Sequence, residues 1–192
     1  MERISKQVNF VEEIEKLKKV TRFNRTMDGR FENSAEHSWQ AAFVSSLFQE
    51  YYPKKLDMEK VMLMLLLHDL GEIYAGDTWV FDEKGKAFSH SNEEKSIEKS
   101  LGMLPTDQYQ SMKKLWLEFE TGDSAVAKYA RVIDALVPLI NHFIVSEDGY
   151  NPNNISSEMV LKKKKFIEEE SPELWELTKE LIQLSKKKGL YL

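Results

Sequence analysis

One segment of eight residues, 65–72, restricts the possible folds of this chain more than any other. It reads Leu-Leu-Leu-His-Asp-Leu-Gly-Glu. A run of leucines is typical of a buried helix, and the burial of His68 and Asp69 without a compensating partner costs free energy. A divalent cation could be that partner, because imidazole nitrogens and carboxylate oxygens are both ligands of first-row divalent metals. The alternative is a core histidine bonded to a neighbour, followed by an aspartate that closes the helix.

A second segment, residues 33–39, predicts the start of another helix. Asn33 or Ser34 can cap its first backbone amides, and Glu36 lies three residues after Asn33, which is the spacing of a capping box. His37 then lies in the first helical turn, where its imidazole is a further candidate metal ligand.

A third segment, residues 128–137, is an apolar helical stretch that contains a single carboxylate, Asp134. Like Asp69, this side chain needs a partner if it is buried. Arg131 lies one turn earlier on the same helix face, so a plain salt bridge between Arg131 and Asp134 is an alternative to metal binding.

The three segments together supply two imidazoles and two carboxylates, from His37, His68, Asp69 and Asp134. We expect these four side chains to bind one divalent metal ion per chain. Such a set suits Mn, Fe, Co, Ni or Zn better than Mg or Ca, which prefer ligands that are all oxygen.

The composition is that of a globular protein with many charged surface residues. The 192 residues carry a net charge of −5, and 42% are hydrophobic while 31% are charged. A chain of this length can form a large core, and we expect a single domain over residues 1–192. The negative charge argues against nucleic-acid binding, and the four lysines at 162–165 are expected on a solvated helix face.

Two absences in the sequence bear on the chemistry and on the location of the protein. The sequence contains no cysteine, which excludes disulfides and cysteine zinc sites. It also contains no apolar segment long enough for a signal peptide or for a membrane span. We therefore expect a cytoplasmic protein without membrane contacts.

Apolar residues recur at helical spacing along most of the chain, which predicts an all-α protein of roughly eight helices. The first helix is marked by apolar residues three apart, Val8, Val11, Ile14 and Leu17. Glu13 is expected on its solvated side. Polar loops are expected over residues 21–32 and 76–91, and a capping box predicts that the next helix begins at Ser91.

The aromatic residues and the remaining histidines have simpler interpretations. Trp39, Trp116 and Trp175 occur at helical spacing and are expected to pack in the core. Trp79 falls in a predicted loop, where it either anchors that loop or borders a pocket. His90 and His142 have no carboxylate cluster nearby and are interpreted as structural or exposed.

The order of these segments is similar to that of the HD-domain metal-dependent phosphohydrolases, a family named for its His-Asp pair. Four stretches carry the similarity: Ser-Ala-Glu-His-Ser-Trp at 34–39, His-Asp-Leu-Gly-Glu-Ile-Tyr-Ala-Gly-Asp at 68–77, Leu-Trp-Leu-Glu-Phe-Glu at 115–120 and Ala-Lys-Tyr-Ala-Arg-Val-Ile-Asp at 127–134. Together they resemble the subfamily that contains bacterial YfbR-type 5'-deoxynucleotidases and the eukaryotic HD-domain-containing protein 2. The resemblance covers about residues 15–140, and helices over 155–188 are expected to pack on that part.

The resemblance implies an HD-domain helical bundle and an enzyme, a metal-dependent phosphomonoesterase. Its expected reaction is hydrolysis of deoxynucleoside 5'-monophosphates to nucleoside and phosphate. Glu72 would be the catalytic residue, because its spacing from His68 and Asp69 puts it on their helix face, where it can transfer a proton. The alternative for Glu72 is an exposed charge at a helix end.

Three further residues match substrate-binding positions of the subfamily. Arg22 would bind the phosphate, for which a guanidinium is well suited, with Arg25 and Arg30 as alternatives. Phe23 would pack near the sugar, at a position where the subfamily carries tryptophan. Asp77 would accept a hydrogen bond from the 3'-hydroxyl.

The resemblance also implies a homodimer. Two other functions stay open at this point. One is an HD phosphohydrolase of another phosphate ester, such as an alarmone or a phosphodiester. The other is a binding module that keeps a metal or nucleotide site without catalysis.

Overall fold

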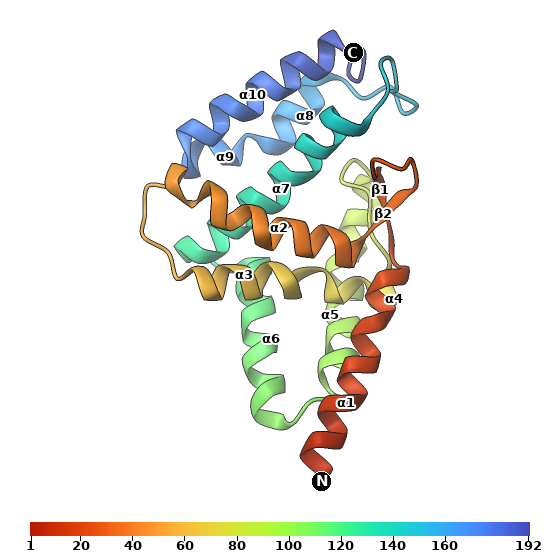
Figure 1. Ribbon diagram of the computed structural model, residues 1–192, viewed down its shortest axis with the longest axis vertical. Coiled ribbons are helices and arrows are strands. Elements are labelled where there is room, and N and C mark those ends of the chain that lie inside the picture. The colour runs from red at the N-terminus through yellow and green to blue at the C-terminus, as the bar shows by residue number, and fades with distance from the viewer.

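The computed structural model describes residues 1–192, and nearly all of its regular structure is helical (Figure 1). The α-helices are α1 (Glu2–Ile14), α2 (Ser34–Phe48), α3 (Met58–Leu67), α4 (Glu72–Ala75), α5 (Glu83–Leu101), α6 (Thr106–Thr121), α7 (Ala125–Val145), α8 (Ser157–Lys164), α9 (Phe166–Glu170) and α10 (Pro172–Lys187). Three short 3-10 helices are η1 (Glu15–Lys19), η2 (Gln49–Tyr51) and η3 (His68–Gly71). Eight of the α-helices have eight or more residues, which confirms the all-α prediction.

Helices α2, α3 and α7 pack on one another in the middle of the molecule. Figure 1 shows α1, α5 and α6 on one side of this centre, toward the N-terminus, and α8, α9 and α10 on the other. The hydrophobic core is continuous from Leu17 in η1 to Ile182 in α10. None of the helices combines the length and the apolar character that crossing a bilayer requires.

The predicted start of α2 is confirmed in detail. The Asn33 side chain accepts a hydrogen bond from the amide of Glu36 at 3.0 Å, and the Glu36 carboxylate accepts one from the amide of Asn33 at 3.1 Å. This reciprocal pair is a capping box, and it satisfies two amides that the first turn of a helix leaves free. It fixes the position of His37 in that turn.

A β-hairpin occupies the segment 21–32, for which the sequence analysis predicted a loop. Strands β1 (Thr21–Arg25) and β2 (Phe31–Asn33) pair antiparallel, and Gly29 in the turn has a φ of +84°, which glycine adopts without strain. The loop prediction was wrong because neither strand alternates apolar and polar residues. The hairpin matters for the site because β1 carries Arg22 and Phe23.

Helix α5 begins at Glu83, eight residues before the predicted start at Ser91. The side chain of Asp82 caps it by accepting a hydrogen bond from the amide of Gly85 at 3.0 Å. The first two turns are almost entirely exposed and carry no apolar periodicity, so the sequence pattern did not mark them as helical.

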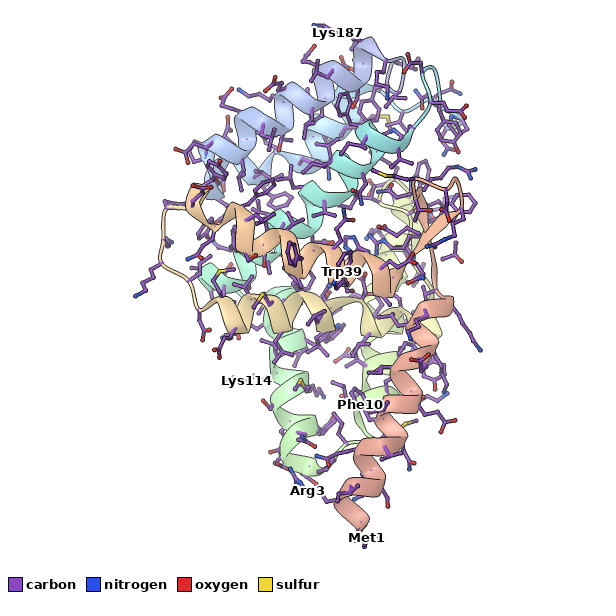
Figure 2. The ribbon with its side chains drawn as sticks, in the orientation of Figure 1. Met1, Arg3, Phe10, Trp39, Lys114 and Lys187 are labelled. Atoms are coloured by element: carbon purple, nitrogen blue, oxygen red, sulfur yellow. The ribbon has the colours of Figure 1, made fainter.

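The orientation of α1 is the reverse of the predicted one. Glu13 is only 2% exposed and accepts hydrogen bonds from Lys16 and Ser100, whereas Val8 and Val11 are each 60% exposed. Helix α1 contacts α5, and Figure 2 shows Phe10 on the side of α1 that faces α5 and α6. The apolar spacing correctly predicted a helix, but of the four residues that marked it only Leu17, in η1, is buried.

Trp39 is likewise not a core residue, since it is 65% exposed, and Figure 2 shows it on the open face of α2. Trp116 and Trp175 are buried, as predicted. The exposed apolar residues of α2 follow one another at a spacing of four, Trp39, Phe43 and Leu47. Because this spacing returns to the same helix face, they form one apolar stripe.

Candidate active site

The four predicted metal ligands meet where α2, η3 and α7 come together. Nε2 of His37 lies 2.9 Å from Oδ1 of Asp134, and Nε2 of His68 lies 3.0 Å from Oδ1 of Asp69 and 3.4 Å from Oδ1 of Asp134. His37, His68 and Asp69 each offer a ligand atom within 4.8 Å of the others. Side chains that are 97 residues apart in the sequence thus converge on one point.

The orientation of His68 is fixed by its backbone surroundings. Nδ1 of His68 is 2.7 Å from the carbonyl oxygen of Leu65, to which it can donate, and this leaves Nε2 facing the two carboxylates. The indole nitrogen of Trp116 donates to the carbonyl oxygen of His68 at 3.0 Å. Gly71 allows η3 to approach α5, because a Cβ atom at this position would lie 2.9 Å from Cβ of Glu93.

The charges of the cluster stabilise one another. Burial disfavours the charged form of His68, but the carboxylates of Asp69 and Asp134 outweigh it and raise its pKa well above the ordinary value. Burial also opposes the charge of Asp69, yet His68 and Arg22 lower its pKa to about 2. Asp134 has its pKa lowered, against burial, by the hydrogen bond with His37 and by the nearby imidazole of His68.

These side chains fit a divalent metal ion. Nε2 of His68 is buried between carboxylates but makes no hydrogen bond of acceptable geometry. A buried nitrogen without a partner, beside a second imidazole and two carboxylates, is the donor set that first-row divalent metals prefer. The residues that could hold such an ion are His37, His68, Asp69 and Asp134.

Glu72 lies beside the cluster and is not an exposed helix-end charge, since it is only 7% exposed. Burial and the nearby charge of Asp69 raise its pKa to about 9. Its Oε2 accepts a hydrogen bond of 2.6 Å from the hydroxyl of Ser34. This carboxyl group is therefore oriented and close to the predicted metal ligands, as a proton donor or acceptor must be.

Arg22 extends from β1 into the same cluster. Its Nη1 donates to Oδ2 of Asp69 at 2.9 Å and lies 3.8 Å from Oε1 of Glu72, while its Nε is 3.6 Å from Oε2 of Glu32. Despite the cost of burial, the negative charges of Asp69 and Asp77 raise its pKa above the ordinary arginine value. Arg22 is thus the buried counter-charge of Asp69, with the carboxyl groups of Glu72 and Glu32 close by. Sequence reasoning missed Glu32, because nothing in its neighbourhood marks it as buried.

Of the other arginines considered in the sequence analysis, Arg25 borders the cavity over the cluster, whereas Arg131 and Arg30 are bonded elsewhere. Arg131 donates to the backbone carbonyls of Phe119 and Gly122, and it forms no salt bridge with Asp134. Arg30 forms a two-pronged pair with Glu36 at the surface.

A cavity of about 730 Å³ opens over the cluster. It is bordered by Arg22, Phe23 and Asp77, the three predicted substrate-binding residues, and by the predicted catalytic residue Glu72. Trp79 also borders it, with its ring centroid 6.0 Å from that of Phe23. Trp79 is also packed against the hydrophobic core, so both interpretations of this residue are observed.

Several other cavity residues were given no role by the sequence analysis. His90 and His142 both border the cavity, where His90 lies 3.1 Å from Glu120 and His142 lies 2.9 Å from the hydroxyl of Ser146. Lys164, from the four-lysine run, borders it as well. Burial lowers the pKa of Lys164 to about 8.

We predict that Arg22→Ala strongly destabilises the metal-free protein, because it leaves buried carboxylates without their counter-charge. The expected loss is about 3–5 kcal/mol in the free energy of unfolding, measured by urea denaturation. Arg30→Ala is the matched control, since it breaks an exposed arginine pair and should have little effect. An equal loss in both variants would contradict the structural role of Arg22.

Known proteins resemble this chain over the segments that form the candidate site. A model of the HD domain family matches residues 14–175. The 5'-deoxynucleotidase HDDC2 of Homo sapiens is 28% identical over 105 residues, which are 55% of this chain and 50% of that protein. The chain thus spans about half the length of this relative. The 5'-deoxynucleotidase HDDC2 of Danio rerio is 27% identical over 150 residues, 78% of this chain and 72% of that one.

A solved structure resembles nearly the whole chain. It is the crystal structure of a predicted metal-dependent phosphohydrolase from Magnetospirillum magnetotacticum MS-1, with 35% sequence identity and a TM-score of 0.90. The similarity covers 98% of this chain and 95% of that one, so it includes the C-terminal helices. With the family match over most of its length, this chain belongs to the HD domain family.

Proposed function

We propose that this protein is a metal-dependent phosphomonoesterase that hydrolyses deoxynucleoside 5'-monophosphates to nucleoside and phosphate. The observation that carries the proposal is a buried His-Asp cluster at the wall of a cavity that also presents Glu72 and Arg22. The similarity to proteins named 5'-deoxynucleotidase supports this choice of substrate.

His37, His68, Asp69 and Asp134 would hold one divalent ion of Mn, Fe, Co, Ni or Zn. Such an ion supplies positive charge to the phosphoryl group and lowers the pKa of a water molecule. The chain itself contributes the orientation of the ligands. The hydrogen bond of His68 to Leu65 fixes which imidazole nitrogen is available.

The remaining residues would position the substrate and move the proton. Arg22 binds phosphate oxygens through its guanidinium group, which can form two parallel hydrogen bonds. Glu72, held by Ser34, transfers a proton to the leaving oxygen or from the attacking water. Asp77 accepts a hydrogen bond from the 3'-hydroxyl of the sugar, and Phe23 with Trp79 provides aromatic surface for the nucleoside.

Two alternatives remain distinct from this proposal. A hydrolase of another phosphate ester would use the same cluster with a different occupant of the cavity. A binding module without catalysis would bind metal and nucleotide but release no phosphate. The burial of Glu72 beside the cluster favours catalysis, because a site that only binds metal has no need of an additional buried carboxyl group.

We predict that the wild-type protein releases phosphate from deoxynucleoside 5'-monophosphates only with added Mn²⁺ or Co²⁺ after chelator treatment. Glu72→Gln keeps the size of the side chain but removes the acid-base group, and should lower kcat by a factor of about 100–10,000. Both the metal dependence of the wild type and the loss of kcat in Glu72→Gln are measured as phosphate release from a panel of deoxy- and ribonucleotides, with and without metal.

The control is retained metal binding by Glu72→Gln, which separates loss of chemistry from loss of the ion. Phosphate release from other phosphate esters, but not from deoxynucleotides, would agree with the proposed hydrolysis and would reject deoxynucleotides as the substrates. A fully active Glu72→Gln would reject the acid-base role, and no release from any ester would favour the binding module.

We also propose that the protein is a homodimer that associates through α2 and α3. Helix α2 exposes the apolar stripe Trp39, Phe43 and Leu47, and helix α3, which packs on α2, exposes Leu63 and Leu66. Helix α2 carries only one charged side chain, Glu36, in its first turn. A second copy is the occupant that fits best, because two uncharged faces can meet without repulsion although each chain carries a net charge of −5.

Phe43→Glu should convert the dimer to a monomer, because it places a charge in the centre of the apolar contact. Phe88→Glu is the matched control, since Phe88 lies on α5 and is 69% exposed outside this surface. Sedimentation velocity measures the two states. A wild-type monomer, or a Phe43→Glu variant that stays dimeric, would contradict the proposal.

A further inference from the structure

Two lysines of the four-lysine run, Lys163 and Lys164, border the cavity of the candidate active site, and only Lys164 has no acidic partner. Lys164 is the last residue of α8, and its Nζ donates to the backbone carbonyl of Ala135 at 2.5 Å. Ala135 follows Asp134, one of the predicted metal ligands, on α7. The amine of Lys164 therefore lies close to the His-Asp cluster, although it comes from a helix beyond the segments that predicted the site.

The helical spacing explains why Lys164 differs from its neighbours. Val160, four residues earlier, is 3% exposed, and Ile167, three residues later, is fully buried, so Lys164 lies on the inward face of this region. Lys163 pairs instead with Glu83 at 2.5 Å, and Lys165 pairs with Glu168. Each of those two amines therefore already has an acidic partner.

Lys164 has no direct anionic partner. It forms no salt bridge, and its one hydrogen-bond acceptor is the neutral carbonyl of Ala135. An ammonium group has three donors and is costly to enclose without an anion. Asp134, the acidic side chain of α7, is near enough to act on the charge of Lys164 but is already hydrogen-bonded to His37. An anionic ligand in the cavity would supply the missing partner.

We propose that Lys164 is a substrate-binding residue that contacts an anionic oxygen of the phosphate group. The proposal rests on the proposed function for the identity of the substrate. Arg22 from β1 and Lys164 from α8 would then bind the same phosphate from two different parts of the fold. The ammonium group of Lys164 is a compact point charge. The guanidinium group of Arg22, by contrast, already donates from Nη1 to Oδ2 of Asp69 at 2.9 Å.

The test measures binding of inorganic phosphate to the full-length protein loaded with Mn²⁺, by isothermal titration calorimetry. Lys164→Met removes the charge and keeps most of the length of the side chain, and should weaken phosphate binding by a factor of roughly 10–100, as expected for a hydrogen bond to a charged group. Lys165→Met, which removes an exposed neighbouring lysine that pairs with Glu168 and does not border the cavity, should bind as the wild type does. Mn²⁺ binding should stay unchanged in both variants.

Two further measurements sharpen the test. Lys164→Gln removes the charge but keeps a polar donor. It replaces Lys164→Met in the experiment if that variant does not fold. With a nucleotide that is turned over, Lys164→Met should raise KM more than it lowers kcat, because the contact is present in the bound substrate.

The outcomes separate this inference from the proposed function. Equal phosphate affinity of wild type and Lys164 variants would overturn the inference, even if the enzyme hydrolyses deoxynucleotides. Phosphate binding that depends on Lys164 would support it, even if no nucleotide is hydrolysed. Failure of the Mn²⁺-loaded wild type to bind phosphate would also overturn it.

Discussion

The structure depends on the mutual compensation of buried charges around His68. His68 and Asp69 are placed in a largely apolar interior, where each would be unfavourable alone, and the partly exposed Asp134 lies beside them. They stabilise one another because η3, α2 and α7 deliver them to one point, and the pKa of His68 rises while that of Asp69 falls to about 2. The fold around them holds this point fixed: Trp116 bonds the backbone of η3, and Gly71 lets α5 approach it.

The cavity above this cluster combines opposite charges with an aromatic surface. Its wall includes the carboxylates of Asp69, Glu72 and Asp134, and the cationic side chains of Arg22 and Lys164. A metal ion would change the balance toward positive charge, and a phosphate monoester would then meet complementary charge on several sides. The C-terminal helices thus border the site as well as adding to the core.

The sequence predicted those parts of the site that local chemistry determines. The capping box at Asn33 and the apolar run before His68 depend on neighbouring residues, so the positions of both histidines followed directly. The inward face of α1 did not, because a buried Glu13 satisfied by Ser100 depends on contacts 87 residues apart. The exposure of Trp39 and the inward turn of Lys164 are likewise set by tertiary packing, which no local pattern records.

The most direct test of this account is the stoichiometry of Mn²⁺ binding, measured by equilibrium dialysis of the chelator-treated protein. The account predicts one ion per chain for the wild type and loss of that ion in Asp69→Asn, which preserves the shape of the side chain but removes its charge. Asp107→Asn, the same substitution at an exposed carboxylate that pairs with Arg3, serves as the comparison and should still bind one ion. A wild type that binds no Mn²⁺, or an Asp69→Asn variant that binds it as tightly as the wild type, would contradict the account.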